Sequence, residues 1–234
     1  MYQIRYKNER GKTKTHWLDS SHTFSFADYY DPAFMGFSDL RVINDDYLAP
    51  GGGFANHPHR DMEIISVVLE GELEHKDSMG NGTVIKVGEI QKMSAGTGVI
   101  HSEYNPSGLE LTRFLQIWVL PDRQGLEPSY QQKAFPMEGM MNTFRLVVSP
   151  DGRENSIVIS QDMELYEAKL QQGAAVKTEI SAQRKYWMHV ASGKVSVNGE
   201  DLEGGDGMGI VAEANVLEFA GLDNLSTVLL FNLK

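Results

Sequence analysis

The chain has 234 residues, of which 41% are apolar and 23% charged, a composition typical of a soluble globular protein. Its formal net charge of −11 makes it a poor non-specific binder of phosphate backbones, so we expect no direct contact with nucleic acid. The absence of cysteine excludes disulfide scaffolds, thiolate zinc sites and cysteine nucleophiles, so any metal must be held by histidines and carboxylates.

At the N-terminus, residues 1–7 are polar and carry no apolar run like that of a signal peptide. No segment approaches the length of about eighteen apolar residues that crosses a bilayer. We therefore expect a cytoplasmic protein with no membrane partner. Since the chain has neither a heptad seam nor a long amphipathic helix, we also expect a monomer.

Short β-type runs recur along the chain and are separated by turn signals. These runs lie at residues 64–69, 83–87, 114–119, 195–197 and 227–231. The segments 79–82 (MGNG) and 198–199 (NG) are turn signals of the kind that close β-hairpins. Because long helical periodicity is absent, the sequence predicts an all-β sandwich or barrel.

A faint internal repeat divides the chain in two. The order strand, Gly turn, strand, hairpin, Gly-acid turn occurs at residues 68–89 and again at 190–206. The repeat predicts two tandem antiparallel β-barrels, over about residues 40–130 and 140–234, with the boundaries uncertain by several residues. We place the two domains at residues 1–135 and 136–234, joined near the Pro- and Gly-containing stretch 121–136.

Two pairs of potential metal ligands stand out, His57-Pro58-His59 and His101-Ser102-Glu103. On a β-strand, residues i and i+2 point to the same face, so two such pairs on neighbouring strands would gather three imidazoles and one carboxylate. That set can hold a divalent transition metal and leave positions open for a substrate. Imidazole suits Fe, Mn, Co, Ni, Cu and Zn, and the carboxylate favours Fe(II) or Mn(II).

Glu63 is an alternative to Glu103 as the carboxylate ligand or as a base. It follows His59 by four residues and shares the face of His59 if the strand is regular. Alternatively, Glu63 does not bind the metal but accepts a hydrogen bond from an imidazole N–H and so orients that ring. Asn105 has the same parity as Glu103 and is expected to support the pocket. The remaining histidines have no partner at ligand spacing and are expected to be hydrogen-bonded or on the surface: His16, His22, His75 and His189.

The second repeat has lost the imidazoles. When the Gly turns of the two repeats are aligned, Glu179 and Ser181 take the positions of the first histidine pair. Glu218 and Ala220 take the positions of the second pair. We therefore expect one metal ion per chain, held by the first barrel.

These motifs resemble the cupin superfamily and, more narrowly, the chain resembles the pirin family along essentially its whole length. The stretches that carry the resemblance are 22–26 (HTFSF), 30–32 (YDP), 40–44 (LRVIN), 57–60 (HPHR) and 93–103 (MSAGTGVIHSE). Residues 77–81 and 103–107 look most like the bacterial pirin-like quercetin 2,3-dioxygenases. The resemblance implies a bicupin, two jelly-roll barrels of the double-stranded β-helix type, with the metal in the N-terminal barrel.

The resemblance also implies the ligands, since pirins take their carboxylate from the His-x-Glu pair. Carried over here, the ligands are His57, His59, His101 and Glu103, with Fe(II) as the first choice of metal. The general cupin pattern would instead choose Glu63, and that alternative stays open.

The activity implied is an oxidoreductase that cleaves a flavonol such as quercetin with O₂ and releases carbon monoxide. A metal would act as the Lewis acid, and Glu103 or Glu63 would be the base. Phe54 is expected to help shape a pocket for flat rings. The alternative is a metal-binding regulatory protein without turnover, which would need a protein partner, as described for eukaryotic pirins.

Overall fold

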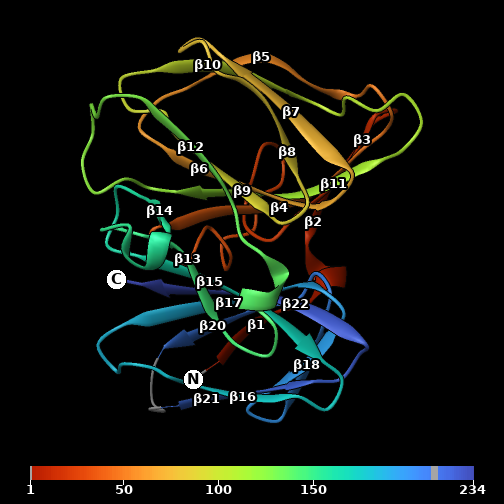
Figure 1. The fold of residues 1–234 in the computed structure, drawn as a ribbon, viewed down its shortest axis with the longest axis vertical. Coiled ribbons are helices and arrows are strands. Elements are labelled where there is room, and N and C mark those ends of the chain that lie inside the picture. Colours follow the sequence, from red (N-terminus) through yellow and green to blue (C-terminus); the bar gives the residue numbers. More distant parts are fainter. Residues whose placement is uncertain (1, 212–215) are drawn as a thin grey trace. The chain divides into compact units, whose positions relative to one another are not determined.

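The computed structural model describes residues 2–211 and 216–234, and almost all of its regular structure is β-strand, as predicted (Figure 1). Its contacts divide the chain into two compact units. The first unit comprises residues 11–135 and 157–161, and the second comprises residues 2–10, 136–156, 162–211 and 216–234. The predicted boundary at residues 135/136 stays a prediction. The contact grouping differs from it at residues 2–10 and 157–161.

The first unit consists of two antiparallel sheets. One sheet has the strand order β12-β9-β6-β11-β4-β3-β2 and the other has the order β5-β10-β7-β8. The strands are β2 (Gly11–Lys14), β3 (Leu18–His22), β4 (Leu40–Leu48), β5 (Gly53–His59), β6 (Glu63–Glu70), β7 (Glu72–Asp77), β8 (Gly82–Lys86), β9 (Glu89–Ser94), β10 (Val99–Tyr104), β11 (Thr112–Val119), β12 (Ser129–Ala134) and the short β14 (Ile157–Val158).

The second unit repeats this plan. One sheet contains the order β1-β20-β17-β22-β15-β13 and the other has the order β16-β21-β18-β19. Its elements are β1 (Tyr2–Arg5), η1 (Lys7–Glu9), η2 (Met137–Gly139), β13 (Arg145–Ser149), η3 (Arg153–Asn155), β15 (Glu164–Gln171), β16 (Ala175–Glu179), β17 (Lys185–Ser192), β18 (Lys194–Val197), β19 (Glu200–Glu203), β20 (Gly207–Val211), β21 (Val216–Gly221) and β22 (Leu225–Leu233).

The Gly turns that suggested the repeat are equivalent in the two units. Gly71 joins β6 to β7 with φ +70°, and Gly193 joins β17 to β18 with φ +78°. A Cβ on Gly71 would lie 2.5 Å from the Leu111 carbonyl oxygen, and one on Gly193 would lie 2.8 Å from the Leu225 carbonyl oxygen. Only glycine tolerates both the left-handed backbone and the close approach, so the repeated glycines are required by the turn.

Each unit buries an apolar core between its two sheets. In the first unit the core joins Leu48 and Phe114 of the larger sheet to Leu73 and Ile85 of the smaller one. The sheets are therefore packed face to face in a jelly-roll arrangement and are not closed into barrels, which refines the predicted barrel. The predicted strands at 64–69, 114–119, 195–197 and 227–231 lie within observed strands, and the one at 83–87 extends one residue beyond β8.

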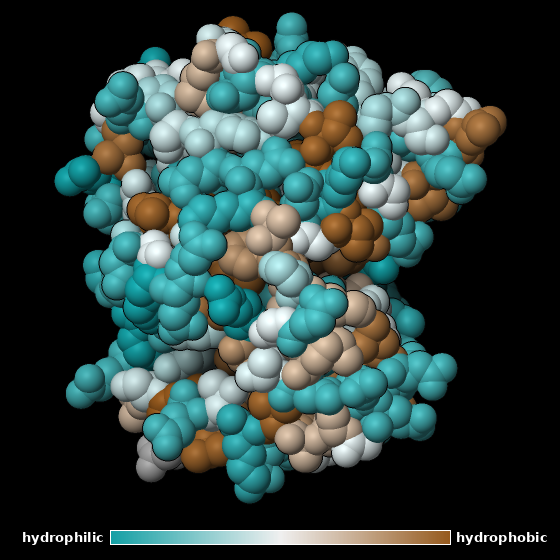
Figure 2. All heavy atoms as spheres, viewed as in Figure 1, coloured by the Kyte–Doolittle hydropathy of each residue, from teal (hydrophilic) through white to brown (hydrophobic). Residues whose placement is uncertain are grey.

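The face of the molecule drawn in Figure 2 is mostly hydrophilic. On the face drawn in Figure 2, hydrophobic side chains form small, separate patches among hydrophilic ones. No helix in the described part of the chain is long and apolar enough to cross a membrane.

Candidate metal centre

Strands β5 and β10 bring the three predicted histidine ligands together in the first unit. The two strands pair with His57 opposite His101, and His59 lies one i+2 step further along β5. The ring centroid of His101 lies 4.4 Å from that of His57 and 4.8 Å from that of His59. One ring nitrogen from each histidine lies within 4.8 Å of the other two, the spacing of a candidate metal site.

A β-bulge in β5 sets the face that these side chains share. His57 pairs with His101, but Glu103 pairs with Phe54. Between these two pairs the chain advances three residues along β5 and only two along β10, so β5 contains one extra residue. The extra residue places Phe54 and His57 against the same cavity although they are three positions apart. It also lets the Nδ1–H of His57 donate to the carbonyl oxygen of Ala55 at 2.8 Å. The Nε2 of His57 is therefore left as the free ligand atom.

The tautomer of His101 is set by a chain of two hydrogen bonds. Asp77 Oδ2 accepts a hydrogen bond from His75 Nε2 at 3.0 Å, and His75 Nδ1 lies 3.4 Å from His101 Nδ1. A carboxylate only accepts, so His75 carries its proton on Nε2 and accepts at Nδ1. His101 must then donate from Nδ1, which leaves a lone pair on its Nε2.

The charges around this chain agree with that assignment. Burial would raise the pKa of Asp77, but hydrogen bonds from His75, Asn81 and Met79 outweigh it and hold this pKa below its usual value. Burial lowers the pKa of His75, since its effect exceeds that of Asp77. At neutral pH the pair is therefore a carboxylate and a neutral imidazole.

Two rings of the cluster, His59 and His101, are held neutral. Burial, followed by the neighbouring His57, lowers the pKa of His59 to about 4. Burial, followed by His57, His59 and His75, lowers the pKa of His101 to about 2. Both rings therefore offer lone pairs at neutral pH.

Glu103 lies in the same cavity but is not part of the three-histidine cluster. It forms a second candidate group with His75 and His101. Its carboxyl accepts hydrogen bonds from Ser66 Oγ at 3.2 Å and Gln116 Nε2 at 2.6 Å. Burial raises its pKa to about 7, so the site holds a carboxyl that can exchange a proton near neutrality.

Glu63 lies in a different environment, because the strand that carries the first histidine pair ends at His59. Asp61 has φ +47°, and Glu63 opens β6, which belongs to the other sheet. There its carboxylate accepts a hydrogen bond from Ser94 Oγ at 2.9 Å and lies 3.5 Å from Lys92 Nζ. It belongs to neither ligand cluster found among the described residues.

Two histidines of the cluster, His57 and His59, line a cavity of about 280 Å³. Its walls include Phe26, Phe54 and Trp118, together with the polar residues Asp46 and Gln116. Trp118 is packed edge-on against Phe26 and His59, with ring centroids 5.4 Å and 5.0 Å apart. Aromatic walls with a few polar groups suit a flat, partly polar molecule.

The residues present fit a bound transition metal. The Nε2 of His101 is buried and has no hydrogen-bond partner among the described residues, an arrangement that costs free energy unless another group uses its lone pair. Two imidazole Nε2 atoms freed by bonds at Nδ1, with a third imidazole and a buried carboxyl beside them, form a donor set for Fe, Mn, Co, Ni, Cu or Zn.

Sequence reasoning missed the roles of two histidines near the site. His75 was expected to be hydrogen-bonded or on the surface; it is hydrogen-bonded, and its partners are Asp77 and the proposed ligand His101. The signal was available in His75-Lys76-Asp77, a pair at same-face spacing. His22 lines the cavity, where Asn44 Oδ1 lies 2.8 Å from its Nδ1. No spacing rule links these last two, since they come from β3 and β4.

The second unit has an ion pair at the positions that correspond to His57 and His101. Strand β16 pairs with β21 as β5 pairs with β10, and Lys177 lies opposite Glu218 in that ladder and forms a salt bridge with it. The residue equivalent to His57 is thus Lys177, two positions from the Glu179 suggested by aligning the Gly turns. Both candidate ligand clusters in the described residues lie in the first unit.

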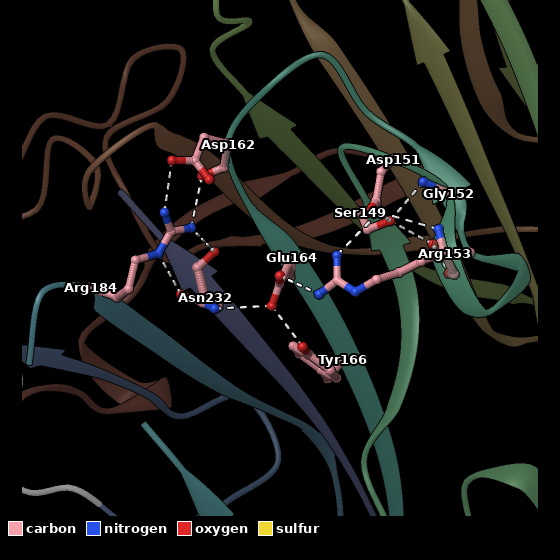
Figure 3. Close-up of polar contacts among 10 residues, drawn as sticks. Ser149, Asp151, Gly152, Arg153, Asp162, Glu164, Tyr166, Arg184 and Asn232 are labelled. Atoms are coloured by element: carbon pink, nitrogen blue, oxygen red, sulfur yellow. Dashed lines mark hydrogen bonds and ion pairs between the residues drawn. The ribbon is translucent and has the colours of Figure 1, made fainter. Parts of the chain in front are cut away.

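Polar contacts around Glu164 occupy part of the second unit (Figure 3). Glu164 accepts hydrogen bonds from Tyr166 Oη at 2.6 Å and Asn232 Nδ2 at 3.0 Å, and it forms a salt bridge with Arg153. Burial would raise the pKa of Glu164, but these partners outweigh burial and lower it.

Replacing Glu164 with Gln is expected to lower the free energy of unfolding by about 1 kcal/mol at pH 7. Because the folded-state pKa of Glu164 is depressed, its contribution is present above about pH 4.3, its unfolded value, and is lost as the pH falls through the folded value. Urea unfolding of Glu164→Gln at pH 7 and pH 3 checks this, with the exposed Glu200→Gln as control. Equal losses at both pH values would contradict it.

Comparison with known proteins finds matches to both halves of the chain. A pirin family model matches residues 3–119, and a quercetinase C-terminal cupin domain matches residues 146–233. A quercetin 2,3-dioxygenase of Escherichia coli K12 is 49% identical over 234 residues, covering 100% of this chain and 99% of the relative.

Two solved structures are similar over the full chain. The crystal structure of YhhW from Escherichia coli has a TM-score of 0.94 at 48% identity, covering 100% of this chain and 98% of that one. The bacterial pirin YhhW in complex with nickel(II), also from Escherichia coli, has a TM-score of 0.93 at 47% identity, covering 100% and 99%. With full-length identity near one half and a matching family model, the chain belongs to the pirin family.

Proposed function

We propose that this protein is a metal-dependent dioxygenase of the quercetin 2,3-dioxygenase type, which cleaves a flat hydroxylated aromatic such as a flavonol with O₂ and releases carbon monoxide. The observation that carries the proposal is the cluster of His57, His59 and His101, of which His57 and His59 line an aromatic-walled cavity. The relatives named quercetin 2,3-dioxygenase support the reaction class.

The proposed ligands are His57, His59 and His101, with Glu103 as the carboxylate. A bound divalent metal, with Fe(II) as the first choice and nickel present in a relative, would supply Lewis acidity and orient the substrate oxygen. The placement of Glu103 beside His101, and of Glu63 beside Lys92, supports Glu103 over Glu63 in this role.

In this proposal Glu103 handles the substrate proton. A raised pKa of about 7 suits a carboxyl group that takes a proton from the flavonol 3-hydroxyl. Gln116 donates to Oε2 and Ser66 donates to Oε1, so the carboxyl plane is fixed before substrate enters. Phe54 and Trp118 cover the ring and exclude water from the reacting oxygen.

The proposal is tested by measuring O₂ uptake and loss of flavonol absorbance with quercetin, using protein reconstituted separately with Fe(II), Mn(II), Co(II), Ni(II), Cu(II) and Zn(II). Metal-dependent turnover with carbon monoxide in the headspace is the expected result. Stoichiometric metal binding without turnover under any metal would overturn the enzyme proposal and favour a metal-bound binding protein.

Glu103→Gln is expected to weaken Ni(II) binding by about 10- to 100-fold, while leaving the fold intact because the amide keeps the shape of the side chain. Glu63→Gln is expected to leave Ni(II) binding unchanged. It should instead lower the free energy of unfolding by about 3 kcal/mol, because the buried Lys92 loses its counter-charge. Chelator competition and urea unfolding of both variants measure the two effects, and the opposite pattern would transfer the ligand role to Glu63.

A further inference from the structure

Besides the histidine cluster, the cavity has two residues with buried polar atoms that make no hydrogen bond among the described residues. These atoms are Asp46 Oδ1 and Trp118 Nε1. One is an acceptor and the other a donor, so together they form a complementary pair. A buried polar atom without a partner costs free energy, and such a cost in a cavity wall is recovered when a ligand supplies the partner.

Asp46 is placed in the cavity by its strand. On β4, Asn44, Asp46 and Leu48 alternate with residues of the opposite face, and Leu48 joins the core between the sheets. Asp46 is 2% exposed. Burial raises its pKa to about 7, although a hydrogen bond from Ser20 acts in the opposite direction.

Trp118 is held rigidly. Its ring makes edge-on contacts with Phe26 and His59, so the indole cannot easily turn to find another acceptor. It lies on β11, where Gln116 of the same face donates to Glu103. The indole N–H is thus part of the same wall as the proposed base.

We propose that Asp46 and Trp118 form a polar pair that selects the substrate, Asp46 accepting a hydrogen bond from one ring hydroxyl and Trp118 donating to the oxygen of another. Both hydroxyls are distinct from the one directed at the histidine cluster. This proposal rests on the proposed function and deepens it, because it restricts the substrate to polyhydroxylated planar aromatics.

The selectivity follows from what each substrate leaves unpaired. A polyhydroxylated ring satisfies both wall atoms, whereas an analogue with a single hydroxyl at the metal leaves a buried carboxylate and a buried N–H without partners. The pair is therefore tested by the ratio of the affinities for these two ligands, and not by the affinity for either one alone. This ratio is measured by binding and requires no turnover.

The test is anaerobic binding, by fluorescence quenching, of quercetin and 3-hydroxyflavone to Ni(II)-loaded protein. The wild type is expected to prefer quercetin. Asp46→Asn, which keeps the shape and replaces one carboxyl oxygen with an N–H donor, should lower quercetin affinity about tenfold and change 3-hydroxyflavone affinity less than about twofold. Trp118→Phe, which keeps a ring and removes the N–H, should also lower the ratio of quercetin affinity to 3-hydroxyflavone affinity.

Asp45→Asn is the matched control. Asp45 is the neighbouring carboxylate on β4, but it points to the opposite face, where Arg113 Nε donates to it at 2.9 Å. The control should keep the wild-type preference for quercetin. If Asp46→Asn does not fold, Trp118→Phe alone decides the result.

Unchanged preference in both cavity variants would overturn the selectivity pair while leaving the dioxygenase proposal standing, provided that the wild type turns quercetin over in air. Absence of both flavonol binding and turnover in the wild type would overturn the proposed function, and the selectivity pair with it. Loss of preference in Asp45→Asn as well would also overturn the pair, because the effect would then not be specific to the cavity.

Discussion

His101→Ala is expected to lower the affinity for Ni(II) and Fe(II) by at least about 100-fold and to abolish turnover of quercetin. The reason is geometric. His101 is the one histidine of the cluster that is fully buried, and its Nε2 has no hydrogen-bond partner in the part of the chain that the structure describes. Its loss removes a ligand and opens the cluster to water. Equilibrium dialysis with elemental analysis, followed by an O₂-uptake assay, measures both consequences.

The matched control for His101→Ala is His189→Ala, which removes a fully buried histidine of the second unit. This variant should keep about one metal ion per chain, since both ligand clusters of the described residues lie in the first unit. Stoichiometric metal in His101→Ala would exclude the proposed site. Two tightly bound ions in the wild type would show that the second unit also holds a metal.

Asp77→Asn is expected to weaken Ni(II) binding by about 10- to 100-fold although Asp77 is not a proposed ligand. An amide nitrogen facing His75 would donate, so His75 would accept at Nε2 and carry its proton on Nδ1. His101 would then have to accept at Nδ1, and its proton would move to Nε2, where the metal should bind. The substitution therefore reverses the tautomers of both rings without removing a ligand.

Two measurements distinguish this effect from damage to the hairpin. Imidazole ¹⁵N chemical shifts of the metal-free protein should show the His101 proton on Nδ1 in the wild type and on Nε2 in Asp77→Asn. Asn81→Ala is the control, since it removes the 2.8 Å hydrogen bond from Asn81 to Asp77 but leaves His75 its acceptor. Equal metal affinity in wild type and Asp77→Asn would contradict the proton assignment.

Local sequence patterns predicted most of the strand architecture. The Asn198-Gly199 signal closes the β18–β19 hairpin, with φ +49° and +87° at its two residues. This worked because a hairpin of this kind depends on two adjacent residues and on little else. The pairing of β1 with β20 escaped prediction, since nothing in residues 2–5 indicates a partner about 200 positions away.

The histidine cluster was predictable for a similar reason. An i, i+2 pair on a strand fixes its own common face, and only the pairing of β5 with β10 had to be supplied by the fold. Glu63 shows the limit of that reasoning. The even spacing between Glu63 and His59 does not place them on one face, because the chain turns at the left-handed Asp61 and continues in the other sheet.

The sequence by itself determined the fold class, the two-unit repeat, the family and the histidine pairs, because each is encoded by residues near one another in the chain. The tertiary structure decided the neighbours of those pairs. It placed His75 and Asp77 behind His101, Gln116 against Glu103, and Asp46 and Trp118 around one cavity. These residues come from separate strands, and only the stacking of two sheets brings them together. The candidate ligands are therefore set by local sequence, whereas their hydrogen-bond partners and the wall of the cavity are set by packing.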